Sequence, residues 1–258
     1  MTIQPVGSQL RQWRQRRRLS QLDLATEAEI SPRHLSFLET GRSQPSREMV
    51  LHLAEQLNVP MRERNVLLVA AGFAPIFSER SLDDPALAPA RAAIDAVLEG
   101  HKPYPAFAID RYWNIVASNR ALQELYEGVA EELLKPPVNA MRLSLHPKGV
   151  AQRIENLAEW RAHLLHQLQE RVEITADPKL IALQKEILSY PAPSTTHPVM
   201  TDAIVIPFKV RIAAGSLSFF TTTMMFGSPV DVTLSELAIE SFFPADESTR
   251  AIVQTLSA

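Results

Sequence analysis

The stretch from Leu10 to Pro45, LRQWRQRRRLSQLDLATEAEISPRHLSFLETGRSQP, decides the fold of the first part of this chain. Apolar and small residues recur there at helical spacing in two short segments, each preceded by a serine. Ser20 and Ser31 suit the N-cap position, because their side-chain oxygens accept hydrogen bonds from free N–H groups at a helix start. Pro32 follows at the first helical position, where its missing N–H leaves nothing unpaired. The pattern predicts two short helices joined by a tight turn.

Further helices are predicted on both sides of this pair. Ser46 suits the N-cap of a fourth helix, and residues 61–71 continue as a fifth helix that ends at Gly72. A first helix over about residues 5–18 is indicated by side chains at helical spacing, namely Val6, Leu10, Trp13 and Arg17. The N-terminal part is therefore expected to be a small all-α domain of five helices.

Together, these residues resemble the five-helix DNA-binding domain of phage-repressor and xenobiotic-response-element (XRE) type regulators. The matching features are L-R-x-x-R, L-S-Q-x-x-L-A, I-S before the third helix, L-E-x-G-R, and P-S before the fourth, over about residues 6–60. Glu29 departs from the pattern, since the family usually has Gly in this turn. A positive φ at Glu29 would carry a strain of about 1 kcal/mol.

The resemblance implies that the third helix enters the major groove of DNA. Pro32, Arg33 and His34 would then face base edges, with Phe37 one turn later. Arg33 could bind guanine O6 and N7 through both arms, and Phe37 could contact a thymine methyl group. The alternatives are a solvated surface charge for Arg33 and a core position for Phe37, whereas His34 could meet base, phosphate or solvent.

The resemblance also implies supporting roles around that helix. Gln21, at the start of the second helix, is expected to contact phosphate, and Arg42 and Ser46 are further phosphate candidates. Arg14 and Glu39 match a pair that forms a structural salt bridge between the first and third helices in relatives.

The composition of the chain limits the classes of protein to which it can belong. It has 258 residues and no Cys, which excludes disulfides and cysteine metal sites and is compatible with a reducing cytoplasm. No signal peptide is expected, and no apolar run approaches the roughly 18–20 residues that span a bilayer. Residues 1–77 carry ten Arg and seven acids, whereas the remainder carries sixteen basic and twenty-two acidic residues. A basic end on an acidic body indicates contact with a polyanion through that end.

Three parts are expected along the chain: a DNA-binding domain (residues 1–74), a proline-punctuated linker (75–102) and a C-terminal domain (103–258). The linker contains a predicted helix from Ala88 to Leu98. The C-terminal domain should begin with a hairpin of residues 106–110 and 113–118. Asn119 is expected to cap a helix that runs to about Tyr126, and further helices are expected at 151–171 and 177–188. Strands are expected at 203–212, 216–226 and 237–243, and Pro207 suggests an edge position for the first of them. The closing helix should be capped by Asp246.

The order strand-strand-helices-strand-strand-strand is typical of a PAS-like sensor domain, which makes the whole chain α+β. The segments PAFAIDRYWNIVASNRALQELY, NAMRLSLHPKG, NLAEWRAHLL and FGSPVDVTLSELAIESFFPAD resemble the ligand-binding domain of MmyB-like regulators, over roughly residues 103–256. The resemblance implies a small apolar or amphipathic ligand, such as a fatty acid or acyl derivative, between the sheet and its helices. No cofactor motif is present.

Candidate ligand contacts are apolar residues of the expected sheet: Phe107, Trp113, Phe208, Phe219 and Met225. Each could equally belong to an ordinary core. Arg142 and His146 could meet an acidic headgroup or could be surface charges. His163, His166 and Glu159 have helical spacing that could bind a metal. Without a third ligand from elsewhere, a solvated helix face is the better interpretation.

We therefore predict a sequence-specific, ligand-responsive transcription regulator that binds double-stranded DNA. A homodimer would place two third helices about 34 Å apart on a pseudo-palindromic operator. The first alternative is a repressor or antitoxin-like protein whose second domain only assembles. The second alternative is an enzyme carried on a DNA-binding module. The sequence argues against it, because it has neither a G-x-S-x-G elbow nor a glycine-rich phosphate loop.

Overall fold

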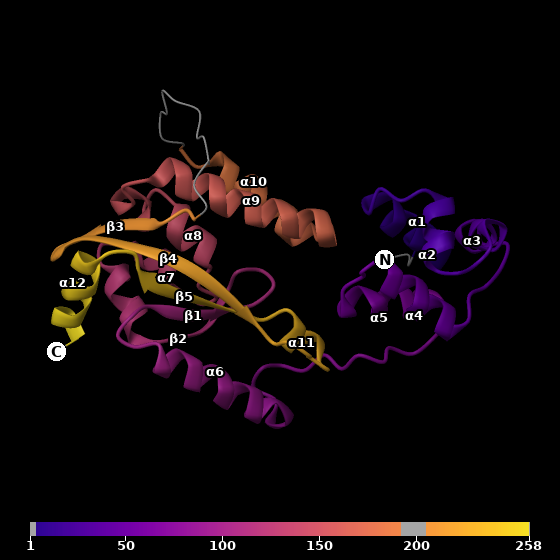
Figure 1. The fold of residues 1–258 in the computed structure, drawn as a ribbon, viewed down its shortest axis with the longest axis horizontal. Coiled ribbons are helices and arrows are strands. Elements are labelled where there is room, and N and C mark those ends of the chain that lie inside the picture. The colour runs from indigo at the N-terminus through magenta and orange to yellow at the C-terminus, as the bar shows by residue number, and fades with distance from the viewer. Residues whose placement is uncertain (1–3, 192–204, 258) are drawn as a thin grey trace. The chain divides into compact units, whose positions relative to one another are not determined.

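The computed structural model describes residues 4–191 and 205–257, and the chain divides into two compact units (Figure 1). The helical unit contains Met1–Arg80 together with Pro229–Ser235. The sheet unit contains Ser81–Ser228 and Glu236–Ala258. A short segment from late in the chain therefore belongs to the N-terminal unit. The domain limits 1–74, 75–102 and 103–258 remain predictions.

Five helices form the N-terminal part of the helical unit, as predicted: α1 (Val6–Arg16), α2 (Gln21–Glu27), α3 (Pro32–Glu39), α4 (Arg47–Gln56) and α5 (Met61–Ala70). The three predicted serine caps are present. Ser20 Oγ accepts from the Asp23 N–H at 3.1 Å, and Ser31 Oγ accepts from the His34 N–H at 3.1 Å. Ser46 Oγ accepts from the Met49 N–H at 3.2 Å. Local sequence thus fixes where these helices begin.

Close packing of α1 on α3 depends on Gly7. A Cβ atom placed on Gly7 would lie 2.2 Å from the carbonyl oxygen of Leu38, so no side chain fits there. Leu10, Leu35 and Leu38 fill the core beneath this contact. In the turn between α2 and α3, Glu29 has φ 52°, so the condition for backbone strain at this residue is met.

The sheet unit is built on a five-stranded antiparallel sheet in the order β2-β1-β5-β4-β3. Its strands are β1 (Ala106–Ile109), β2 (Ile115–Ser118), β3 (Phe208–Ile212), β4 (Gly215–Met225) and β5 (Ala238–Pro244). The strand order along the chain is the predicted one, and β3 lies at an edge as Pro207 suggested. The predicted strand 203–212 begins only at Phe208; residues 203 and 204 lie outside the described residues.

Helices cover both faces of this sheet. Figure 1 shows α9 (Leu157–Thr175) and α10 (Pro178–Ser189) on one side and α6 (Ala88–Gly100) on the other. The shorter helices are η1 (Pro85–Leu87), η2 (Arg120–Tyr126), α7 (Glu131–Leu134), α8 (Ala140–Leu145) and η3 (Val150–Arg153), and α12 (Glu247–Ser257) closes the unit. Asp246 Oδ1 accepts from the Thr249 N–H at 2.7 Å, which is the cap predicted for α12.

Two predictions in this unit are wrong in detail. The helix predicted to start at Ala151 begins at Leu157, because residues 150–153 form the separate 3₁₀ helix η3. Residues 120–126 also form a 3₁₀ helix, and Asn119 does not cap it with its side chain. Buried Asn119 instead accepts from the Ala106 N–H at 3.1 Å and donates to two backbone carbonyls, a tertiary use that overrides its local preference.

The late segment of the helical unit, Pro229–Ser235, follows β4 in the chain and precedes β5. It includes the short helix α11 (Val232–Ser235) and packs on α5. Val232 is fully buried, and its N–H donates to the Ser78 carbonyl at 2.8 Å. Buried Asp231 forms an ion pair with Arg80 at 3.0 Å, and the Thr233 hydroxyl donates to the Arg80 carbonyl. These contacts fasten the end of the N-terminal segment.

Candidate DNA interface and ligand cavity

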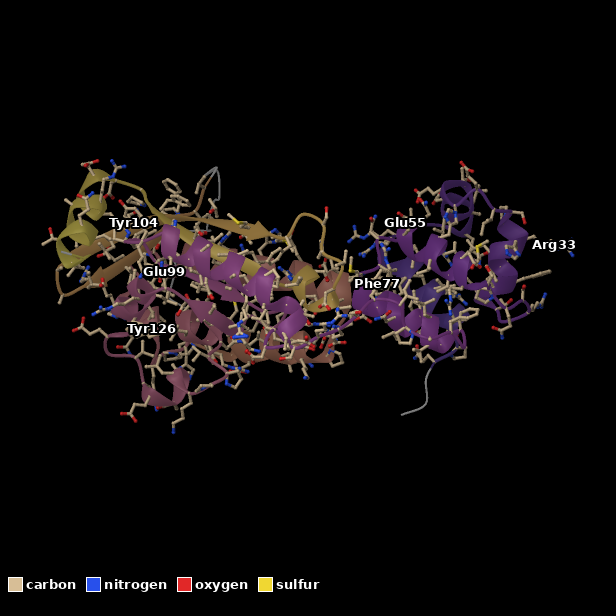
Figure 2. The ribbon with its side chains drawn as sticks, turned by 90° about the horizontal axis from the view of Figure 1, so that it is seen from below. Arg33, Glu55, Phe77, Glu99, Tyr104 and Tyr126 are labelled. Carbon is tan, nitrogen blue, oxygen red and sulfur yellow. The ribbon has the colours of Figure 1, made fainter. Side chains whose placement is uncertain are left out.

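The exposed side of α3 carries the residues predicted to read DNA. Pro32 and Arg33 are exposed, whereas His34 and Phe37 are half-buried. Arg33 projects from the surface of the helical unit (Figure 2). Its guanidinium lies 5.3 Å from the Phe37 ring centroid, and that of exposed Arg42 lies 5.8 Å from the same ring. The face therefore presents two cations held against one aromatic ring.

A buried ion pair supports this face from behind. Arg14 donates through Nε and Nη2 to the two carboxylate oxygens of Glu39, at 2.6 and 2.8 Å. A third donor of Arg14 binds the Leu19 carbonyl at 2.9 Å. The hydrogen bond that Arg14 donates to Glu39 raises the pKa of Arg14 above its ordinary value. The two-armed geometry fixes α1 relative to the end of α3, as the resemblance implied.

Two predicted phosphate contacts already have partners within the unit. Gln21 is half-buried, and its side-chain amide donates to Glu39 Oε2 at 2.8 Å. Ser46 is exposed, and its hydroxyl oxygen accepts from the Met49 N–H in the first turn of α4. Gln21 thus forms a cluster with Arg14 and Glu39. This contact could be predicted only with knowledge of the tertiary fold. Backbone N–H groups at the start of α2 remain candidates for phosphate contact.

The sheet unit contains a cavity between the sheet and its helices. The water-accessible space inside it is about 80 Å³, several times the roughly 10–15 Å³ that one water molecule needs. Its wall is largely aromatic and aliphatic, with contributions from β1, β4, β5, α8 and α9. The apolar lining residues are Phe107, Trp113, Ile115, Leu122, Leu125, Ala140, Met141, Leu143, Val150, Trp160, Leu164, Phe208 and Phe242.

The structure divides the predicted ligand contacts. Phe107, Trp113 and Phe208 line the cavity. Fully buried Phe219 belongs to the core next to it, and Met225, at the end of β4, is 52% exposed. The structure thus leaves two of the five predicted aromatic or sulfur contacts outside the lining.

The two predicted partners of an acidic headgroup also lie outside the lining. Arg142 donates through two nitrogens to Glu186, at 2.8 and 2.7 Å, which raises the pKa of Arg142. The ring of His146 packs edge-on against Tyr190, with centroids 4.9 Å apart. Arg142 and His146 therefore contact α10 and the residue that directly follows it.

Six polar side chains complete the wall: Tyr126, Ser144, His163, Gln167, Thr221 and Glu240. Burial raises the pKa of Tyr126 to about 12 and also raises the pKa of Glu240. Burial, and then the neighbouring His166, lowers the pKa of His163. Sequence reasoning missed Glu240 and Gln167. The available signal was an acid within the apolar strand sequence AIESFFP.

Among the described residues, no three His, Cys, Asp or Glu side chains gather into a set that could hold a metal ion. His166 instead faces Glu170 on the surface of α9, with Nε2 and Oε1 3.5 Å apart. Within the same part of the chain, no helix combines the length and apolar character needed to cross a bilayer.

The helical unit contains two serine-capped helices joined by a tight turn, and the sheet unit contains an apolar cavity. This combination defines a helix-turn-helix transcription regulator with a ligand-binding domain. Comparison with known families agrees. Residues 10–64 match the helix-turn-helix family, and residues 90–256 match the family described as MmyB-like transcription regulator ligand binding domain. The chain belongs to the MmyB-like transcription regulators.

Two individual proteins show more limited similarity. Multiprotein-bridging factor 1 of Debaryomyces hansenii is 34% identical over 61 residues, which is 24% of this chain and 41% of that protein. A solved RNA-binding light-oxygen-voltage receptor is 14% identical with a TM-score of 0.26, and the match covers 96% of this chain and 63% of that one. The chain thus spans less than two thirds of either protein, and the low TM-score carries no conclusion about shared fold.

Proposed function

We propose that this regulator binds a specific DNA sequence through α3 and adjusts that binding to a small amphipathic molecule held in the sheet unit. The observation that carries the proposal is the apolar cavity within a domain of a ligand-binding family. An apolar wall of this extent suits a hydrocarbon chain, as in a fatty acid or an acyl derivative.

In the DNA complex, Arg33 and Phe37 are the proposed sequence readers. Arg33 carries two-armed donors suited to guanine, and Phe37 offers an apolar edge to a thymine methyl group. Arg42 and the N-terminal N–H groups of α2 supply phosphate contacts, which set orientation and give salt-dependent affinity. The Arg14–Glu39–Gln21 cluster keeps α3 in place and does not itself read bases.

A route from ligand to DNA follows from the path of the chain. Thr221 and Glu240 line the cavity on β4 and β5, and the segment between these strands, Pro229–Ser235, is fastened to the helical unit. A ligand that favours one arrangement of β4 and β5 would bias this segment and, through it, the helical unit. Such a ligand changes DNA affinity only if it binds the two arrangements unequally.

We further propose a homodimer on a pseudo-palindromic operator, because one copy of α3 reads only a few base pairs. The rival proposal makes the sheet unit an assembly module without a ligand. The apolar cavity favours the sensing role, since an assembly domain has no need of an internal space lined by aromatic side chains.

The decisive experiment combines native mass spectrometry with DNA selection on the full chain. We expect the purified protein to retain a lipid-sized molecule that solvent extraction releases. We also expect a random DNA pool to yield a site with two-fold symmetry, and removal of the molecule to change affinity for that site. Binding to the selected DNA that is unaffected by any extracted or added amphiphile would support the assembly role instead.

A further inference from the structure

Helix α9 carries a cation at the end of its row of cavity-lining residues. This row follows helical spacing along one face and consists of Trp160, His163, Leu164 and Gln167. Arg171 continues the row one turn beyond Gln167. It is half-buried, and its guanidinium lies 5.4 Å from the ring centroid of Trp113, which itself lines the cavity. The Trp113 ring is therefore shared by the cavity and this cation.

No carboxylate of the described residues contacts the Arg171 guanidinium, which forms neither a hydrogen bond nor an ion pair with them. The two acids that attract it have other partners. Arg111 holds Glu236 at 3.1 Å, and the Thr223 hydroxyl donates to Glu240 Oε1 at 2.8 Å. Burial lowers the pKa of Arg171, because the attraction of these acids does not offset the loss of hydration. An anion that reached this guanidinium would stabilise it.

Glu240 is compatible with such an anion. It lines the cavity from the central strand β5, where it pairs with Phe107 on β1 and Thr223 on β4. Burial raises the pKa of Glu240, which favours the neutral carboxyl group. A neutral carboxyl group does not repel a carboxylate and can donate a hydrogen bond to it. This part of the cavity thus offers an anion a cation and a hydrogen-bond donor.

A strained turn positions the Trp113 ring. Trp113 has φ 61°, a conformation that bulky residues rarely adopt. Asp110 fixes this turn, because its Oδ1 accepts from the N–H groups of Tyr112 and Asn114 at 2.8 and 2.9 Å. Strain of this kind persists where the surrounding structure maintains it, and it is frequent at binding sites. The turn thus places the ring next to both the cavity and Arg171.

We propose that Arg171 is the specificity-determining residue of the cavity and binds the free carboxylate of an amphipathic ligand whose hydrocarbon chain lies against the apolar wall. This inference rests on the proposed function, because it assumes that the cavity binds a chain-bearing ligand. A guanidinium can donate two parallel hydrogen bonds to a carboxylate, so the ligand supplies the counter-ion that the protein does not. Arg142, which the sequence suggested for this role, is already held by Glu186.

The test compares octanoate with octan-1-ol, which share a chain length and differ in charge. Each is titrated calorimetrically into the delipidated full chain at neutral pH. We expect octanoate to bind at least about tenfold more tightly than octan-1-ol, because only the carboxylate pairs with the guanidinium. Arg171→Gln should weaken octanoate binding at least about tenfold and change octan-1-ol binding by less than about threefold.

Lys185→Gln is the matched control for loss of one positive charge, because Lys185 is an exposed residue of α10 that does not line the cavity. It should keep the octanoate preference of the unmodified protein. If Arg171→Gln weakens both ligands equally or neither, Arg171 does not bind the carboxylate and the inference is overturned. Octanoate that binds the unmodified protein no more tightly than octan-1-ol would also overturn it and leave the sensing function standing. Failure of both ligands to bind the folded, unmodified protein would overturn the sensing function itself.

Discussion

The Phe37 ring lies close to two guanidinium groups, those of Arg33 and Arg42. Contacts of a cation with an aromatic face are worth about 0.5–1 kcal/mol at exposed sites. That energy is enough to bias the rotamers of two long side chains that would otherwise sample many directions. Because fewer rotamers are lost on binding, a preoriented Arg33 pays a smaller entropic cost when it meets a base edge. If Arg33 reads a base as proposed, the Phe37 ring would favour that contact even without touching a base itself.

Arg33→Ala tests the base-reading role. We expect a loss of roughly 1–3 kcal/mol in affinity for the selected site and a relaxed preference at one base pair, because a two-armed contact to guanine disappears. Competition binding to a library of single-base variants measures both effects. Arg11→Ala, at an exposed position of α1, is the control for loss of one positive charge. An equal fall in affinity for every sequence would make Arg33 a phosphate contact.

Glu240 should leave a signature in the pH dependence of stability. Its pKa is raised in the folded state, so its contribution is fully present below the pKa of the unfolded chain and is lost as pH rises through the folded value. Glu240→Gln should therefore be increasingly stable relative to the unmodified protein as pH rises above about 4.5. Urea unfolding monitored by tryptophan fluorescence measures the difference, in a Trp13→Phe background so that the signal comes from Trp113 and Trp160. A difference independent of pH would contradict the raised pKa.

Among the secondary-structure elements, those with local causes were predictable from the sequence. Helix starts at Ser20, Ser31 and Ser46 depend on residues three positions apart, so spacing alone identifies them. Asn119 was mispredicted because its amide serves backbone groups brought close by tertiary folding. Glu240 was missed for the same reason: only the packing of α9 on the sheet makes its face a cavity wall. Met225 was predicted to contact a ligand, but the structure places it at the end of β4, where the strand is exposed to solvent.

The packing of α1 on α3 gives an element-scale prediction. Gly7→Ala should destabilise the helical unit by roughly 1–3 kcal/mol, because the added methyl meets the Leu38 carbonyl and the helices must separate. Hydrogen exchange of α1 and α3 amides in the full chain measures the loss. Gly100→Ala is the matched control: no atom lies within 4 Å of its Cβ position, so protection in α6 should hold or improve. Similar protection in both variants would contradict the close contact.

At the scale of the whole molecule, each unit has its own core. The proposed regulation requires ligand binding in the cavity to change DNA binding by α3. Coupling between binding sites is typically 1–3 kcal/mol and requires an element whose equilibrium both sites bias. The segment Pro229–Ser235 is our candidate, because it is continuous with two cavity strands and is fastened at Ser78 and Arg80. Its few contacts are specific and can be removed one at a time.

Asp231→Asn tests this role at the scale of the whole chain. The ion pair with Arg80 is lost, so we expect DNA affinity without ligand to stay within about threefold of the unmodified value. The effect on that affinity of the molecule extracted from the purified protein should fall at least about fivefold. Fluorescence anisotropy with the selected operator measures both. Asp83→Asn, which removes a pair between exposed Asp83 and Arg91, should leave the ligand effect intact. An undiminished effect in Asp231→Asn would exclude the segment as the coupling element.

The helical unit is assembled from two separate parts of the chain, and these parts are synthesised at different times. Its first eighty residues emerge from the ribosome early and can form their five helices, but Asp231 and Val232 arrive only after most of the sheet unit has been made. Until then, Arg80 lacks its buried partner and the surface that Val232 covers stays open to solvent. A nascent or prematurely terminated chain would therefore present α3 without these contacts, which are the proposed link to ligand control. If that link operates as proposed, DNA binding can respond to a ligand only after residue 235 has been synthesised.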